Sequence, residues 1–214
     1  MIAAARSYTP AEAAALSEVA LKAVHNAIDK RIVEGRGEQT KAGTPRRALT
    51  DADLLHLKLW YGVGSVLAAD RRQRLFEAIK AEPAAATVRA DAFLIVDVEE
   101  ARRQLADRVH QLEEAKTLVH SAEGVMGGEP VFKGTRVPVR TVASMLAQGA
   151  SSMEIADGYP SLTPRMIELA AIWSAAHPAR GRPRKLAGDK LEAKSSKRAP
   201  LKGDPRTRAS GGSE

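Results

Sequence analysis

The sequence predicts a mainly α-helical protein assembled from small units, and three observations support this class. Only 4% of the 214 residues are aromatic, whereas alanine is abundant, which favours helices packed through Ala, Leu and Val over a β-sandwich. Helix start signals, in which Thr or Ser precedes Pro or stands three residues before an acidic side chain, recur along the chain. A hydrophobic content of 44% is enough for a packed core in each of two small domains.

Residues 1–62 are predicted to form a winged helix-turn-helix. Thr9 can cap a first helix, with Pro10 at its first position and Glu12 three residues after the cap. A short turn at 17–20 precedes a second helix, and the predicted buried positions of the two helices are Ala11, Ala14, Ala15, Leu16, Leu21, Val24 and Ile28. The polar, glycine-rich stretch 34–45 has the composition of a wing. Thr50 then caps a third helix, whose predicted inward residues are Leu54, Leu57 and Trp60.

Residues 63–120 are predicted to form a helical connector with one short strand. A helix is expected from about Ser65 to Ala81, with Val66, Leu75, Phe76 and Ile79 buried. The apolar run 92–98 is either a strand or the entry to a buried helix. A longer helix over 98–119 carries the one-heptad series Val98, Leu105, Leu112 and Val119. This series is interpreted either as a dimerisation stripe or as packing against the helix's own domain, and its short length favours packing.

Residues 121–178 are predicted to form a homeodomain-like unit of three helices preceded by a β-hairpin. Lys133-Gly134 can close the hairpin between 130–132 and 135–137, and Pro138 is expected to bar further strand pairing. The helices are predicted from Val139 to a stop at Gly149, from the capping box at 151–154 to Gly158, and from Thr163 to 177. The predicted buried residues of the third helix are Ile167, Ala170, Ala171 and either Trp173 or Ser174.

The net charge of +7 is concentrated at the C-terminal end. Residues 178–214 contain 11 Lys and Arg against 4 Asp and Glu, while the rest of the chain has 22 of each sign. Because residues 179–214 also have almost no large apolar side chains, they are predicted to be a disordered basic tail. A nucleic-acid interface in residues 1–178 must therefore depend on local patches.

The second helix of residues 1–62 is the predicted reader of the major groove. With Leu21, Val24 and Ile28 inside, its outward positions are Lys22, His25, Asn26 and Asp29. The cations expected to contact phosphates in and around the wing are Lys30, Arg31, Arg36, Lys41, Arg46 and Arg47. Because acidic residues at 18, 29, 34 and 38 dilute the positive charge, an ordinary solvated surface is the alternative interpretation.

The unit at 121–178 is expected to contact protein rather than DNA, because its third helix offers only Arg165 as a cation, beside Glu168. Arg136 is either an ordinary surface residue or a pairing partner for an acidic protein. In the tail, Arg180-Gly181-Arg182-Pro183 resembles the core of an AT-hook. The tail candidates for binding DNA or an acidic site on a partner protein are Arg180, Arg182, Arg184 and Lys185, with a solvated basic tail as the alternative.

No residue pattern indicates catalysis, a metal site or a cofactor. The chain has no cysteine, and the five histidines are scattered without metal-ligand spacing. Adjacent glutamates at 99–100 and 113–114 point in different directions on a helix, and no glycine-rich phosphate loop is present. Without an export signal or an apolar span, the protein is expected to be non-enzymatic, soluble and cytoplasmic.

Residues 125–173 resemble the domain-of-unknown-function family 433 (DUF433), found in VapB-type antitoxins. The resemblance rests on the segment from Gly127 to Val139, and on Gly149, Ile155, Tyr159-Pro160 and Leu162-Thr163. Residues 8–14 and 46–54 are similar to MerR-like winged helix-turn-helix proteins. Together these resemblances imply an antitoxin that binds its own operator DNA as a homo-oligomer and neutralises a toxin, often a PIN-type ribonuclease. The alternatives are a transcription regulator without a toxin and a purely structural interaction module.

Overall fold

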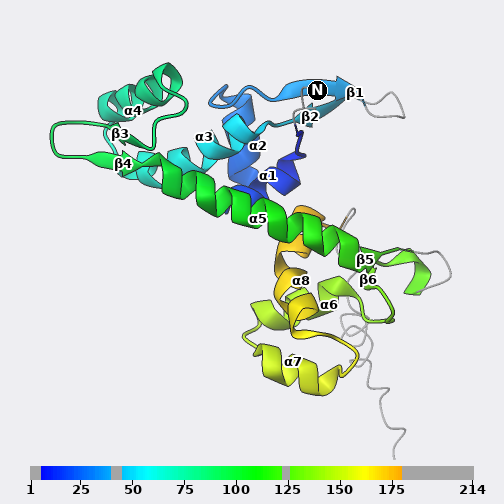
Figure 1. The fold of residues 1–214 in the computed structure, drawn as a ribbon. Helices are drawn as coiled ribbons and strands as arrows, with labels where there is room; N and C mark the ends of the chain where they lie inside the picture. The colour runs from blue at the N-terminus through cyan, green and yellow to red at the C-terminus, as the bar shows by residue number, and fades with distance from the viewer. Residues whose placement is uncertain (1–5, 40–44, 122–125, 180–214) are drawn as a thin grey trace, which may run out of the picture. The chain divides into compact units, whose positions relative to one another are not determined.

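The structure is a computed structural model that describes residues 6–39, 45–121 and 126–179. As the composition predicts, it is mainly helical, with short antiparallel strand pairs (Figure 1). The described residues up to Pro178 belong to one compact unit. Of the predicted basic tail, 179–214, all residues from 180 onward lie outside the described part of the chain.

The first two helices form where the sequence predicts them. Helix α1 (Pro10–Ser17) begins at a capping box: the Thr9 hydroxyl accepts from the Glu12 N–H at 3.1 Å, and the Glu12 carboxylate accepts from the Thr9 N–H at 2.9 Å. The helix ends at Glu18, which has a left-handed φ of 60°. After Val19 and Ala20, α2 (Leu21–Asp29) begins, so the predicted tight turn is present.

Two strands follow α2 in the segment predicted to be a wing. Strands β1 (Arg36–Gln39) and β2 (Pro45–Ala48) pair antiparallel, with Gly37 opposite Arg47. Just beyond β2, Leu49 exchanges two backbone hydrogen bonds of 2.8 Å with Tyr8. These bonds join the segment before α1 to the end of the strand pair.

Helix α3 (Asp51–Tyr61) starts at the predicted Thr50 cap, and Leu54 and Leu57 are buried as expected, while Trp60 is half-buried. The next helix is shorter than predicted. A 3-10 turn, η1 (Val63–Val66), is followed by extended backbone at Leu67, so α4 spans only Ala69–Ala81. Val66 was predicted to be buried in this helix, and this is wrong: it lies before α4 and is 82% exposed.

The apolar run 92–98 is only partly a strand. Strands β3 (Thr87–Arg89) and β4 (Ile95–Asp97) pair antiparallel, and Val96 is buried while Ile95 is exposed. Phe93 lies in the tight turn between the strands, where its N–H donates to the Asp91 carboxylate at 2.7 Å, and it is 99% exposed. A two-stranded pair with one covered face cannot bury a continuous apolar run.

Helix α5 (Val98–Leu118) is a single continuous helix (Figure 1). Val98 packs in a smaller core with residues of α3, α4 and the β3–β4 pair, while Leu105 and Leu112 pack in the main core. The helix's buried residues are Val98, Ala101, Leu105, Val109, Leu112 and Ala115. The stripe is therefore covered by the protein's own chain, in agreement with the packing interpretation.

The predicted hairpin around Lys133-Gly134 is present only as a turn and a single bridge, and not as a pair of strands. Strand β6 (Val131–Phe132) pairs with β5 (Val119–His120), which directly follows α5, and residues 135–137 form no strand. The predicted turn itself is present, because the Thr135 N–H donates to the Phe132 carbonyl and Gly134 has a φ of 78°. The 3-10 turn η2 (Met126–Gly128) lies in the connection between β5 and β6.

Pro138 makes an isolated bridge to Val131, although it was expected to bar further pairing. The two hydrogen bonds of this bridge run from the Phe132 N–H to the Val137 carbonyl and from the Val139 N–H to the Pro130 carbonyl. Neither bond needs an N–H from Pro138, which explains why proline is tolerated there.

The three predicted C-terminal helices are present as α6 (Val139–Ala147), α7 (Ser152–Gly158) and α8 (Pro164–Ala176). Gly149 follows α6 with a φ of 93°, and Ser151 and Glu154 form the expected capping box. Helix α8 packs against α1, α5, α6 and α7. Contact on several sides explains its larger buried set, which is Ile167, Leu169, Ala170, Ile172, Trp173 and Ala176. Ala171, predicted to be buried, is exposed.

The main hydrophobic core runs through both predicted domains. It joins Leu16 and Leu54 of the N-terminal helices to Leu112 of α5 and to Phe132 and Ile167 of the C-terminal region. The predicted boundaries at 62/63 and 120/121 stay predictions, but no break in the core accompanies them. Among the helices of the described chain, none has the length and apolarity needed to cross a membrane.

Candidate nucleic-acid interface

Helix α2 presents its predicted polar face to solvent. Val24 and Ala27 are buried on its inner side, whereas Lys22, His25 and Asn26 are exposed. None of these three side chains has an ion-pair or side-chain hydrogen-bond partner among the residues that the structure describes. Lysine, asparagine and histidine carry the donors that can reach base edges or phosphates.

Contacts from α3 and α5 hold the α1–α2 turn and α2 itself. The Tyr61 hydroxyl donates to the Ala23 carbonyl of α2 at 2.9 Å. The Glu18 carboxylate accepts from Lys58 of α3 at 2.9 Å and from Arg108 of α5 at 3.1 Å. The hydrogen bond from Lys58 and the charge of Arg108 outweigh burial and lower the pKa of Glu18 below its ordinary value of 4.5.

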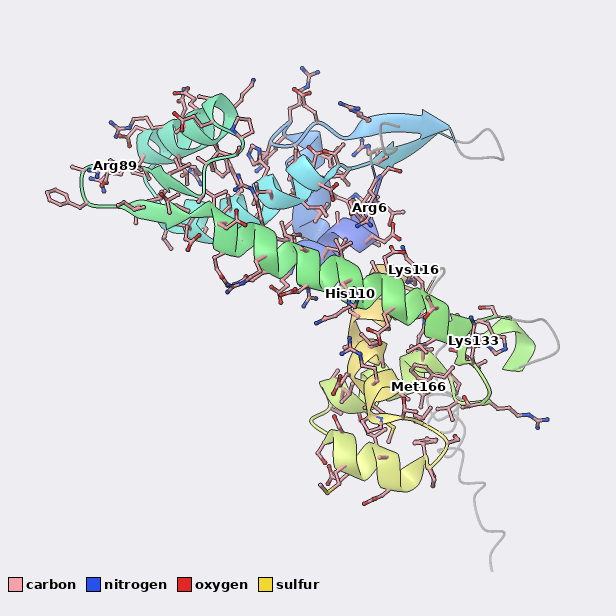
Figure 2. The ribbon with its side chains drawn as sticks, viewed as in Figure 1. Arg6, Arg89, His110, Lys116, Lys133 and Met166 are labelled. Carbon is pink, nitrogen blue, oxygen red and sulfur yellow. The ribbon has the colours of Figure 1, made fainter. Side chains whose placement is uncertain are left out.

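Helix α5 also caps the end of α1. Arg108 donates from Nε at 3.0 Å and from Nη2 at 2.7 Å to the Ala15 carbonyl, one of the terminal carbonyls of α1. Lys116 of α5 also forms an ion pair of 2.9 Å with Glu12, near the start of α1. Figure 2 shows Lys116 and His110 along α5. Helix α5 thus contacts α1 at both of its ends.

Strand β2 places Arg47 beside α2. Arg47 of β2 forms an ion pair of 2.7 Å with Asp29, the last residue of α2, and the two side chains are 53% and 60% exposed. A pair this exposed contributes little to stability, so a phosphate can compete for the guanidinium. Asp29 both reduces the positive charge and holds Arg47 next to α2. The sequence suggested only the first of these roles, because a contact across 18 residues depends on the tertiary fold.

The other predicted DNA-binding residues are placed as follows. Lys30 and Arg31 are exposed immediately after α2, and Arg31 has a left-handed φ of 56°. Arg36, on β1, is exposed. Arg46 lies on β2 opposite Glu38 in the register, and nothing further is described of its side chain. Lys41 lies outside the described residues, as do Arg180, Arg182, Arg184 and Lys185 of the tail.

Helix α8 uses its one cation, Arg165, for contacts within the protein. Arg165, at the start of α8, donates to the two carboxylate oxygens of Glu114 on α5 at 2.9 and 2.6 Å, and to Glu168 at 2.9 Å. These hydrogen bonds lower the pKa of Glu114 and raise that of Arg165. A bidentate guanidinium–carboxylate pair leaves this arginine poorly available to DNA.

Arg136, the predicted protein-binding candidate, is exposed and forms no ion pair with any residue that the structure describes. Lys133, in the turn after β6, is exposed as well (Figure 2). In the described ranges, no group of three or more His, Asp or Glu side chains is arranged to hold a metal ion.

Three comparisons relate this chain to known proteins. The family described as "Protein of unknown function (DUF433)" matches residues 119–173. The uncharacterized protein y4eO of Sinorhizobium fredii (strain NBRC 101917 / NGR234) is 33% identical over 203 residues, which cover 88% of this chain and 89% of that protein. The crystal structure of Rv2018 from Mycobacterium tuberculosis is 15% identical with a TM-score of 0.30, covering 76% of this chain and 95% of that chain. The predicted DUF433 domain is thereby confirmed.

Proposed function

For a chain that belongs to the family of the y4eO protein and contains a DUF433 domain, we propose the function of a non-enzymatic antitoxin that represses its own promoter. In this proposal residues 1–62 act as a MerR-like winged helix-turn-helix on operator DNA. The DUF433 region and the basic tail neutralise a partner toxin of the PIN-type ribonuclease class. A homo-oligomer in the cytoplasm would present two such DNA-binding units to a repeated operator.

One observation carries the DNA-binding part: the exposed face of α2 bears Lys22, His25 and Asn26, whose side chains have no partner among the described residues. An ordinary solvated surface would also expose these residues. However, the buttressing of α2 and of the turn before it by Tyr61, Lys58 and Arg108 gives this face the rigidity that base recognition needs. The adjacent strand pair adds Arg47, whose weak ion pair with Asp29 can be exchanged for a phosphate contact.

The toxin-binding part rests on the pairing state of two arginines in the C-terminal region. Arg165 is committed to Glu114, so α8 offers DNA no free cation, while Arg136 is exposed and unpaired among the described residues. Met153 on α7 is 76% exposed, and exposed methionine is frequent at protein-binding surfaces. Arginines of the tail have the chemistry to pair with the carboxylates of a nuclease active site.

The DNA-binding part is tested by fluorescence anisotropy with labelled DNA from upstream of the protein's own gene. Lys22→Ala/Asn26→Ala should weaken binding by at least about tenfold, since a specific base contact contributes roughly 1–3 kcal/mol. Lys133→Ala removes the same single positive charge from the C-terminal region and should leave affinity within about twofold. Equal affinity in all three proteins would show that α2 does not read this DNA.

The antitoxin part is tested with the protein encoded by the neighbouring gene. That protein should arrest growth when expressed alone, and co-expression with this chain should restore growth and allow both to be co-purified. A harmless neighbour, combined with normal promoter binding, would leave the stand-alone transcription regulator as the function.

The role of the tail is tested by truncation after Pro178. Loss of toxin inhibition with DNA affinity intact would assign the tail to the toxin, whereas weaker DNA binding would assign it to the AT-hook interpretation. A truncated protein that retains both activities would exclude a binding role for Arg180, Arg182, Arg184 and Lys185.

A further inference from the structure

Helices α3, α4 and α5 line a groove of about 1250 Å³. Its floor is apolar, and its apolar lining consists mainly of Leu54, Leu55, Leu59, Phe76, Ile79, Leu105 and Val109. Small-molecule sites in proteins are typically concave and largely apolar, with a few polar groups that orient the ligand. The proposed DNA contacts on the outer face of α2 do not use this groove.

One wall of the groove is aromatic. The His56 ring stacks on Phe76 with a centroid separation of 4.3 Å and an interplanar angle of 7°. Trp60 lies 5.2 Å from Phe76, and the Arg72 guanidinium sits 4.8 Å above the Trp60 ring. Flat side chains gathered on one wall favour a ligand that is itself planar.

The same wall contains a polar atom without a partner. His56 Nε2 is buried and has no hydrogen-bond partner among the described residues. Burial lowers the pKa of His56 below its ordinary value of 6.5, so the imidazole is neutral at pH 7 and can either donate or accept. A buried nitrogen left unpaired is costly, and a polar group of a ligand that formed a hydrogen bond with it would remove that cost.

The rim of the groove is more positive than negative. Five cationic side chains line it, Arg6, Arg31, Arg72, Lys80 and Arg102, against three carboxylates, Asp51, Glu77 and Glu113. Glu113 is already paired with Lys116, at 3.0 Å. By contrast, Arg31, Arg72 and Lys80 form no ion pair within the part of the chain that the structure describes. This balance favours an anionic ligand over a neutral or cationic one.

We propose that the groove between α3, α4 and α5 is a binding site for a planar aromatic anion, an organic molecule whose rings stack against Phe76 and Trp60 while its carboxylate or sulfonate pairs with Arg72. The anionic group lies at the rim, where water still reaches it, and the ring system occupies the apolar floor. Bound ligand would touch Arg31 and Ile32 after α2 as well as the start of α3.

The first experiment titrates the full chain with 8-anilino-1-naphthalenesulfonate, a planar aromatic sulfonate whose fluorescence rises in apolar sites. One molecule should bind per chain, and calorimetry should give the same stoichiometry. Ala106→Phe places a ring in the groove from an exposed position on α5 and should weaken binding at least about tenfold. Ala171→Phe, the same change at an exposed position of α8 outside the groove, should bind like the wild type. Circular dichroism establishes that both variants are folded.

The second experiment tests the anionic group separately from the rings. Arg72→Gln should weaken binding of the sulfonate about fivefold or more, yet leave binding of the uncharged parent N-phenyl-1-naphthylamine within about twofold. Loss of both ligands to the same extent would overturn the proposed charge recognition. Unchanged binding in Ala106→Phe would place the ligand elsewhere and overturn the site.

A third outcome would also overturn the proposal. If the sulfonate fails to bind the wild type, and Ala106→Phe converts an oligomer to a monomer in size-exclusion chromatography with light scattering, the groove is an interface between two copies of the chain. Neither result depends on DNA or toxin, so failure here is separable from failure of the proposed antitoxin function.

Discussion

The two helices that could read DNA, α2 and α8, are used in opposite ways. Helix α2 buries one side, with Val24 and Ala27 inside, and exposes Lys22, His25 and Asn26. Helix α8 packs against four other helices and commits its cation, Arg165, to Glu114. A recognition helix must have a free polar face. Most of the surface of α8 is instead buried against its four neighbouring helices. Helix α2 thus leaves one polar face open to solvent, whereas α8 is a core element of the C-terminal region.

The two regions are nevertheless joined, because α8 contacts α1 directly and Ile167 shares a core with Leu16. Ile167→Ala should therefore lower the free energy of unfolding by about 3 kcal/mol, within the roughly 2–5 kcal/mol typical of a buried Ile→Ala change. Urea denaturation followed by circular dichroism should show one transition at a lower midpoint. Met153→Ala, at a 76% exposed position, is the control and should change stability by less than about 0.5 kcal/mol. Two separate transitions would mean that the regions fold independently.

The capping boxes of the two regions should differ in strength. Glu12 caps α1 and also binds Lys116, and its side chain is 13% exposed, whereas Glu154 caps the short α7 at an exposed site. Glu12→Gln should cost about 1–2 kcal/mol at pH 7 through loss of the ion pair and a weaker cap. Glu154→Gln should cost less, and equal effects would remove the distinction between the two helix starts.

The carboxylates of Glu12 and Glu18 predict how the free energy of unfolding depends on pH. Although burial raises the pKa of Glu12, the Thr9 N–H and Lys116 outweigh it, so the pKa of Glu12 lies below 4.5, as does that of Glu18. The stability that they contribute is complete above pH 4.5 and is lost as the pH falls through their lower native values. Unfolding free energies measured from pH 6 to pH 3 should thus fall less steeply in Glu12→Gln than in the wild type. A parallel decline would show that Glu12 does not contribute to acid sensitivity.

Gly149, at the end of α6 in the C-terminal region, has a backbone conformation that favours glycine. The residue has a φ of 93°, a conformation that a side chain disfavours, and it lets the Ala150 N–H reach the Met145 carbonyl at the end of α6. Gly149→Ala should lower the melting temperature, with a cost of about 1 kcal/mol. Gly158→Ala is the matched control at a position without a positive φ or a nearby atom, and it should cost less. Equal losses would contradict the conformational explanation.

The smallest predicted effect concerns the ion pair between Asp29 and Arg47 beside α2. Asp29→Asn removes the carboxylate that holds Arg47 and reduces negative charge beside α2. Affinity for the promoter DNA should rise about two- to fivefold at low salt, and the gain should shrink as salt increases. Glu168→Gln removes the same charge from α8 and should leave DNA affinity unchanged. Weaker binding by Asp29→Asn would mean that the ion pair is needed to position Arg47.

Local signals in the sequence predicted the helix starts and the turns well. The caps at Thr9, Thr50, Ser151 and Thr163 are present because a cap needs only residues within one turn of each other. Predictions failed where partners are distant. The strand that pairs with β6 is β5, which directly follows α5, whereas the predicted partner segment adds only the single bridge at Pro138. Val66 is exposed and Ala171 faces solvent because neighbouring elements, not helical spacing, decide which sides are covered.

By itself the sequence determined a mainly helical chain, the outward face of α2 and a DUF433 domain, since composition, short-range periodicity and a contiguous motif specify these features. Only the tertiary structure decided the Asp29–Arg47 pair, the capture of Arg165 by Glu114 and the groove between α3, α4 and α5. The two ion pairs join residues 18 and 51 positions apart, and the groove brings together side chains from three separate helices. No local pattern encodes which of many possible partners the folded backbone will bring together.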